Sequence, residues 1–116
     1  MLDDVFCKIV AGEIKADVVY KDDDFWVIKD INAQAPIHLL IIPTKHVASL
    51  EDFMEGNNEA LLGKGMVVAH KVAHQMGIAE KGYRLILNEG EDGGKLVPHL
   101  HIHLLGGKKL GPKIVR

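Results

Sequence analysis

The pattern of apolar and polar positions predicts a chain of short strands with one long helix. Apolar, β-branched runs predict strands at 18–20, 25–29, 38–42 and 83–88. The run at 38–42 is continuously apolar after His38 and is closed by Pro43, which is typical of a central strand buried on both faces. Helical spacing predicts the long helix from Asn57 or Asn58 to Gly77. Its expected buried stripe comprises Leu61, Leu62, Met66, Ala69, Val72, Ala73 and Met76.

Two shorter helical segments complete the predicted elements. Asp3 or Asp4 can cap a helix through about Ala11, with Gly12 ending it. A further helical turn is expected to begin at Ser49. Hairpin strands, one long helix and then another strand pair indicate an α+β fold with an antiparallel sheet.

A strict alternation of histidine and apolar residues runs through 99–105. On a strand, His99, His101 and His103 would lie on one face, and the intervening apolar residues would enter the core. On a helix, His99 and His103 would have the i, i+4 spacing common in metal sites. Gly106 and Gly107 end the run after one to two turns, which is too short for a stable helix. The pattern therefore favours a strand.

Length and composition exclude several classes of protein. The chain has 116 residues, which predicts one domain over 1–116 with a tail at 106–116. A net charge of −2 gives no basic surface for nucleic acid. One cysteine, Cys7, excludes an internal disulfide and a multi-cysteine zinc site. The acidic start and the lack of a long apolar run predict a cytoplasmic protein without a membrane partner.

The histidine row is the main candidate for chemistry. Neighbours two residues away on a strand lie roughly 6.5–7 Å apart, so three imidazoles can reach one phosphate group. His101, in the middle, could attack phosphorus and form a covalent intermediate while its neighbours donate hydrogen bonds. The same imidazoles could instead hold zinc with an open position, or lie on the surface by chance. Spacing alone leaves these alternatives open.

Other polar residues have weaker signals. The glycine-rich loop at 88–94 leads into the histidine row and could bind an anion through backbone N–H groups. His38 becomes a proton relay if its strand lies beside the histidine row. Asp30 follows a strand and could accept a hydrogen bond from a ribose hydroxyl. The remaining histidines are interpreted as structural or surface residues: His46, His70 and His74.

The motif at 99–105 resembles the histidine-triad (HIT) superfamily signature, His-φ-His-φ-His-φ-φ, where φ is apolar. The similarity covers nearly the whole chain and is greatest to the Hint branch. The matching segments are Phe6-Cys7-Lys8-Ile9, Gly12-Glu13-Ile14, Asp30 to His38, Ile42-Pro43, Gly82-Tyr83-Arg84, and Asn88 with Gly93-Gly94. The terminal segments Leu104-Leu105-Gly106-Gly107 and Leu110-Gly111-Pro112 resemble bacterial members of the branch. This resemblance favours nucleophilic catalysis over a metal centre.

The resemblance implies a fold and an activity. It implies a HIT-like fold with a five-stranded antiparallel sheet, one long and one short helix, and sheets joined across a homodimer. It implies hydrolysis of nucleoside 5′-phosphoramidates, with a purine nucleotide as substrate and no cofactor or catalytic metal. A nucleotide-binding regulatory protein with weak turnover and a dinucleoside polyphosphate hydrolase are the alternatives.

Site residues carry over by position. His101 is the implied nucleophile, His103 and His99 steady the phosphate, and His38 completes the proton relay. His101 and His103 also count among the nucleotide-binding residues. The other implied nucleotide contacts are Asp30, Ile31, Asn88, Gly94, Lys95 and Leu96.

The chain departs from the branch at three places. Lys95-Leu96 replaces the usual Gln-Ser or Gln-Thr, so a hydroxyl near the leaving group is missing. Pro98 replaces a residue with a backbone N–H. Asp4 stands where some bacterial relatives carry the first cysteine of a Cys-x-x-Cys zinc pair, so Cys7 lacks that partner and structural zinc is not expected.

Overall fold

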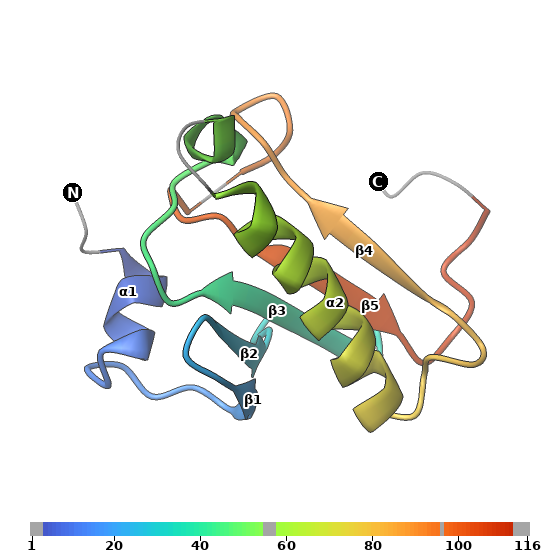
Figure 1. Cartoon of the computed structure of the whole chain (residues 1–116). Coiled ribbons are helices and arrows are strands. Elements are labelled where there is room, and N and C mark those ends of the chain that lie inside the picture. Colours follow the sequence, from blue (N-terminus) through green and yellow to red (C-terminus); the bar gives the residue numbers. More distant parts are fainter. Residues whose placement is uncertain (1–3, 55–57, 96, 113–116) are drawn as a thin grey trace.

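A five-stranded antiparallel sheet forms the centre of the molecule (Figure 1). The structure is a computed structural model and describes residues 4–54, 58–95 and 97–112. The strands lie in the order β1-β2-β3-β5-β4. Their bounds are Val18–Lys21 for β1, Phe25–Lys29 for β2, Ile37–Pro43 for β3, Tyr83–Leu87 for β4 and Ile102–Gly106 for β5. The predicted α+β class and the central position of the third strand are confirmed.

Three helical segments accompany the sheet. Helix α1 spans Val5–Val10, the 3₁₀ helix η1 spans Leu50–Met54, and α2 spans Glu59–Gln75. Asp4 caps α1, because its carboxylate accepts the Cys7 backbone N–H at 2.8 Å. Asp3 and Asn57, the other possible start points, lie outside the described residues. Within the described ranges, no helix has the length and apolar character needed to cross a membrane.

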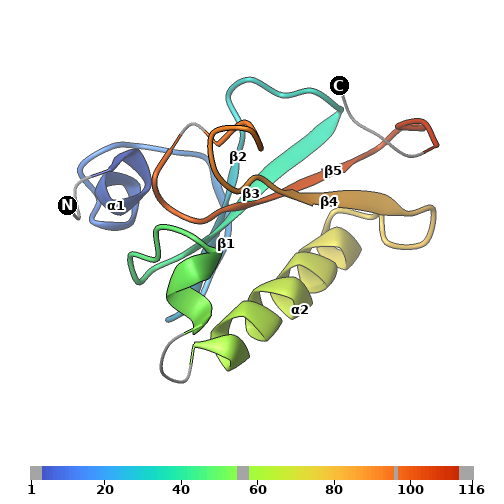
Figure 2. The same cartoon turned by 90° about the horizontal axis from the view of Figure 1, so that it is seen from above.

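The two faces of the sheet carry different helices. Helix α2 packs along one face, and α1 lies on the other side near one end of the strands (Figure 2). Alternate residues of β3 divide between them, with Leu39 and Ile41 in the core under α2 and Leu40 and Ile42 in the core with α1. His38 alternates with Leu40 and Ile42 along β3, so its side chain lies on the same face of the sheet as α1.

The buried stripe of α2 differs from the predicted one. Met66 is 47% exposed, whereas Val68 is buried with Ala69, Val72 and Ala73. Gly65 explains which side of α2 faces the sheet. A Cβ at this position would lie 2.9 Å from Cζ of Phe25, so only glycine allows the helix to approach the sheet this closely.

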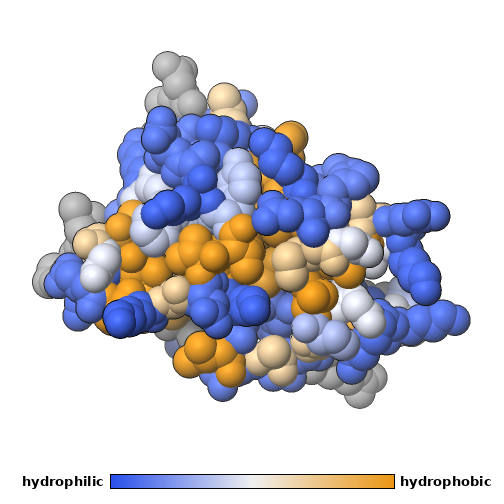
Figure 3. Space-filling view, turned by 90° about the horizontal axis from the view of Figure 1, so that it is seen from below, coloured by the Kyte–Doolittle hydropathy of each residue, from blue (hydrophilic) through white to orange (hydrophobic). Residues whose placement is uncertain are grey.

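Exposed apolar side chains remain on the surface of the described residues. They include Val18 on β1 and Met66 and Val67 on α2. In the space-filling view, apolar side chains form an interrupted band across one face, between polar areas (Figure 3).

Candidate active site

The histidine segment is not a strand over its full length. Strand β5 begins at Ile102, so the prediction of a strand from His99 is wrong at its start. The apolar half of the prediction is confirmed, because Leu100, Ile102 and Leu104 all enter the core under α2. The three histidines consequently do not share one surface. His101 and His103 line a cavity of about 660 Å³ on the α1 face, and His99 does not line it.

His101 is held as a neutral ring with one reactive nitrogen. Its Nδ1 lies 2.8 Å from the carbonyl oxygen of His99. A carbonyl only accepts, so Nδ1 carries the proton and Nε2 keeps its lone pair. Burial lowers the pKa of His101 below its ordinary value, although the hydrogen bond to His99 acts in the opposite direction. The ring is therefore suited to nucleophilic attack from Nε2.

A chain of hydrogen bonds fixes the tautomers of His38 and His103. The backbone N–H of Gln34 donates to Nδ1 of His38 at 3.0 Å, so Nε2 of His38 carries that ring's proton. Nε2 of His38 lies 3.0 Å from Nδ1 of His103 and 3.2 Å from the Asp30 carboxylate. His103 accepts at Nδ1 and is left with an N–H on Nε2.

The environment keeps His103 neutral. Burial, followed by the neighbouring rings of His101 and His38, lowers the pKa of His103 to about 4. Asp30 acts in the opposite direction and does not offset these effects. A neutral His103 can donate one hydrogen bond into the cavity at neutral pH.

Phe6 and Ile9 of α1, with Ile28 and Leu40 of the sheet, form apolar walls of this cavity. Phe6 also meets the His101 ring edge-on, with ring centroids 4.9 Å apart. Asp30 and Ile31 lie along the rim, and Ile31 is 96% exposed. An exposed isoleucine at the mouth of an apolar cleft offers a flat surface for a planar ring.

The glycine-rich loop meets the cavity through two of its predicted residues, Asn88 and Gly94. The Asn88 side chain donates to the carbonyl of Gly93 at 2.6 Å and thereby ties the loop closed. Gly94 has φ of +81°, a left-handed conformation that favours glycine. Both residues thus line the cavity, and their contact with a nucleotide stays a prediction.

The remaining predicted contacts have different outcomes. Lys95 does not line the cavity; its ammonium donates to the carbonyl of Ala48 and lies 3.8 Å from the Glu89 carboxylate. Leu96 lies outside the described residues.

His99 has no access to the cavity. Its side chain is completely buried, with Nε2 3.0 Å from the carbonyl of Pro43 and Nδ1 3.1 Å from Asp4. That His99 helps to steady the phosphate stays a prediction, and its side chain does not line the cavity. His99 acts on the cavity through its backbone carbonyl, which orients His101.

Sequence reasoning also missed two partnerships. Asp30 contacts His38, and His46 lies in a cluster with Asp4, Cys7 and His99. The first pairing joins the adjoining ends of the sequential strands β2 and β3, whereas the second joins residues far apart in the chain, which no local pattern could reveal. Cys7 has no second cysteine beside it, but its side chain lies in a group of four donor side chains with Asp4, His46 and His99.

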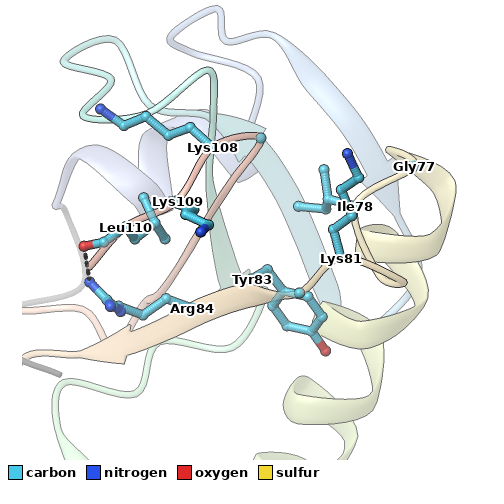
Figure 4. A pocket seen from close by; sticks show the side chains of 10 residues that line it. Gly77, Ile78, Lys81, Tyr83, Arg84, Lys108, Lys109 and Leu110 are labelled. Carbon is cyan, nitrogen blue, oxygen red and sulfur yellow. Dashed lines mark hydrogen bonds between the residues drawn. The ribbon is translucent and has the colours of Figure 1, made fainter. Parts of the chain in front are cut away.

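Another cavity, of about 900 Å³, lies at the start of β4 (Figure 4). It lies between the turn from α2 to β4 and the segment 107–110, and its cations include Lys81 and Lys109. Arg84 donates to the carbonyl oxygens of Leu110 and Gly111 and so fixes this segment beside β4. The cavity contains none of the seven histidines.

Fold and site together define a small α+β protein with a buried, oriented histidine beside an apolar cavity. The HIT domain family model matches residues 11–110. The chain belongs to this family. It is 47% identical to the purine nucleoside phosphoramidase of Escherichia coli over 110 residues, which covers 95% of this chain and 92% of the relative.

Solved structures agree with the family assignment. A HIT family hydrolase from Clostridium thermocellum superposes with a TM-score of 0.90 at 46% identity, and the match covers 99% of both chains. A histidine triad protein from Clostridium difficile has a TM-score of 0.90 at 42% identity over 98% of both chains. The expected HIT-like fold is confirmed.

Proposed function

We propose that this protein hydrolyses purine nucleoside 5′-phosphoramidates through a covalent nucleotidyl-His101 intermediate. The observation that carries the proposal is the hydrogen bond from His101 Nδ1 to the His99 carbonyl, which leaves Nε2 unprotonated on a ring that lines the cavity. Similarity to the phosphoramidase of Escherichia coli over most of both chains supports the substrate class.

The reaction proceeds in two displacements. Nε2 of His101 bonds to phosphorus as the P–N bond breaks, and the amine leaves after gaining a proton from water, directly or after the His38–His103 pair has taken that proton up and passed it on. Water then attacks phosphorus, loses a proton, and breaks the histidine–phosphorus bond. The products are a nucleoside monophosphate and an amine, and His101 is regenerated.

His103 stabilises charge on the phosphoryl group during both steps. Its Nε2–H is the donor left free by the hydrogen bond at Nδ1. His38 holds that tautomer, and the Asp30 carboxylate stabilises positive charge on the pair when a proton passes through it. The apolar walls formed by Phe6 and Ile9 suit a purine ring, and Asp30 also lies where a ribose hydroxyl could donate to it.

The test is steady-state hydrolysis of an adenosine 5′-phosphoramidate by wild type, His101→Ala and the surface variant His74→Ala. We expect release of AMP by wild type and His74→Ala and none by His101→Ala. Faster cleavage of a dinucleoside polyphosphate than of the phosphoramidate would contradict the substrate class. Nucleotide binding without any turnover would contradict the enzymatic function and support a regulatory one.

We further propose a homodimer that forms at the β4 edge of the sheet. Among the described residues, β4 has a single neighbouring strand, so its other edge has unpaired backbone groups. His70 on α2 contacts Tyr83 of β4 at 2.5 Å, which places the exposed Met66 and Val67 on this side of α2.

The lone cysteine also fits the reducing cytoplasm, which we propose as the location of the protein.

Light scattering at micromolar concentration tests the dimer. One chain has a mass of 12.8 kDa, and we expect twice this mass for wild type. For Val67→Glu we expect a lower mass, shifted towards that of a single chain. A wild-type protein with the mass of one chain would contradict the proposal.

A further inference from the structure

The cavity at the start of β4 is lined by four cationic side chains that the proposed reaction does not use. They are Lys81, Arg84, Lys108 and Lys109, out of fourteen lysines and arginines in the whole chain. Of the residues that the structure describes, no aspartate or glutamate lines this cavity of about 900 Å³. Because the chain as a whole has a net charge of −2, positive charge is concentrated here against the overall balance.

None of these four cations forms an ion pair with a carboxylate in the described part of the chain, whereas Lys64 and Lys95 do. Arg84 donates two hydrogen bonds, at 3.2 Å to the carbonyl oxygen of Leu110 and at 2.7 Å to that of Gly111. Carbonyl oxygens carry no net charge, and a guanidinium group has five N–H donors. The positive charge in this cavity is therefore not neutralised by the described residues.

The cations stand on two sides of the cavity (Figure 4). Lys81 lies beside Ile78 in the turn that follows α2, and Lys109 lies on the other side, in the segment after β5, with Tyr83 between them. The side chain of Lys108 extends away from Lys81. Charges of one sign on opposite walls of a cleft focus their potential into the space between the walls. That space favours an anion long enough to contact both sides.

Two glycines shape the walls of this cavity. Gly107 has φ of +90°, and a Cβ there would lie 3.1 Å from Cβ of Pro36, so glycine lets the segment after β5 turn close against the start of β3. A Cβ at Gly106 would lie 2.6 Å from Cδ1 of Ile78, so this glycine lets the Ile78 side chain pack directly on β5. With Arg84 fixing the segment to β4, the cleft is formed before any ligand binds, which lowers the cost of binding.

We propose that this cavity binds a triphosphate chain, either free or at the end of a nucleotide. A triphosphate carries several negative charges along one extended group, which suits cations on opposite walls of a cavity this large better than a single phosphate does. Arginine binds phosphate oxygens through two parallel N–H groups, and lysine binds them as a point charge. Lys81, Arg84 and Lys109 are the main contacts, and Lys108 contributes less because its side chain extends away.

This site is separate from the histidine cavity, because no residue lines both. The proposal therefore goes beyond the reaction at His101 and does not depend on it. Hydrolysis of the adenosine 5′-phosphoramidate by the double variant Lys81→Gln/Lys109→Gln should match hydrolysis by wild type. Failure of one proposal is thus distinguishable from failure of the other.

Isothermal titration calorimetry of the full chain with inorganic triphosphate, in buffer without divalent cations, tests the proposal. We expect one triphosphate per chain, with binding that weakens as salt is added. Lys81→Gln and Lys109→Gln should each weaken affinity by more than about tenfold, and the double variant should show no binding. Lys108→Gln should weaken it by less than about fivefold. Lys8→Gln removes the same charge from a lysine outside both cavities and should bind as wild type does.

Titration with ATP distinguishes the two sources of a triphosphate. ATP binding that is lost in the double variant and is at least as tight as that of inorganic triphosphate would identify a nucleotide as the ligand, and weaker binding would identify free triphosphate. No binding of triphosphate by wild type would overturn the proposal. Equal weakening in Lys8→Gln and Lys109→Gln would also overturn it, since only general charge attraction would then act. Binding that is kept in the double variant but lost in His101→Ala would place the triphosphate in the histidine cavity instead.

Discussion

Two histidine clusters lie next to each other, and both contain histidines from the segment 99–103. His101 and His103 contribute to the open cluster with His38 and Asp30. His99 contributes to the closed cluster with Asp4, Cys7 and His46. The side chain of His103 is 20% exposed and that of His99 is 0% exposed.

The difference between the clusters lies in which ring nitrogen faces a carbonyl. His101 gives Nδ1–H to a carbonyl and keeps Nε2 for the cavity, whereas His99 directs Nε2 to a carbonyl and Nδ1 to a carboxylate. Both nitrogens of His99 are thereby occupied inside the protein. Residue type alone does not separate nucleophile from support; burial and hydrogen-bond partners do.

The largest expected effect separates His101 from His99. His101→Ala should lower kcat by at least about 10⁴-fold, because the covalent route is lost, and should cost less than about 2 kcal/mol of stability. Steady-state kinetics and urea unfolding measure the two quantities. A variant that retains most of its kcat would remove His101 from the role of nucleophile.

His99→Ala should show the opposite balance. It removes a fully buried ring and leaves the Asp4 carboxylate and the Pro43 carbonyl without that partner, which should cost about 2–4 kcal/mol. Urea unfolding at pH 7 measures this loss, with His74→Ala as the surface control. A His99→Ala protein as stable as wild type but inactive would break the distinction between the clusters.

His103→Asn should lower kcat by about 10²–10⁴-fold, since the donor to the phosphoryl group and the acceptor for His38 are both altered. It should also change the pH dependence of stability. The folded pKa of about 4 lies below the unfolded value near 6.5, so the unfolded state binds more protons between these values.

Stability from His103 is therefore complete above about pH 6.5 and is lost as the pH falls towards 4, by at most about 3 kcal/mol. Urea unfolding of wild type and His103→Asn from pH 7 to 4 should converge towards low pH. A difference between the two proteins that stays constant across this range would show that His103 is not held neutral by its surroundings.

The smallest expected effect concerns the residue after Lys95. Leu96→Ser should raise kcat mainly for strongly basic amines, by less than about 10²-fold, because a hydroxyl that only donates a hydrogen bond assists departure weakly. The measurement is kcat of both proteins across amines of graded pKa. Parallel slopes would show that this position does not assist the leaving group.

Local patterns were sufficient for the elements and for part of the site. Period-two and helical spacing located the strands and α2, and the alternation through 99–105 correctly gave the core side of Leu100, Ile102 and Leu104. The side of α2 that faces the sheet was harder to predict, because apolar residues occur on most sides of its first turns. The close contact of Gly65 with Phe25, which determines that side, is a tertiary feature.

The roles of individual histidines depended on contacts between distant segments. Extending a regular strand back to His99 put all three rings on one face, but the ordered strand starts at Ile102. His46 was interpreted as structural because nothing near it in sequence signals chemistry. Its partners, Asp4 and His99, come from the two ends of the chain.

The most direct test of this account is where the nucleotide attaches. Wild-type protein is mixed with an adenosine 5′-phosphoramidate, stopped in alkali within the first turnover, and digested for peptide mass spectrometry. The account predicts an added AMP on His101 alone, absent from His99 and His103 and absent from the His101→Ala variant. An adduct on another residue, or AMP release in the first turnover with no adduct, would contradict it.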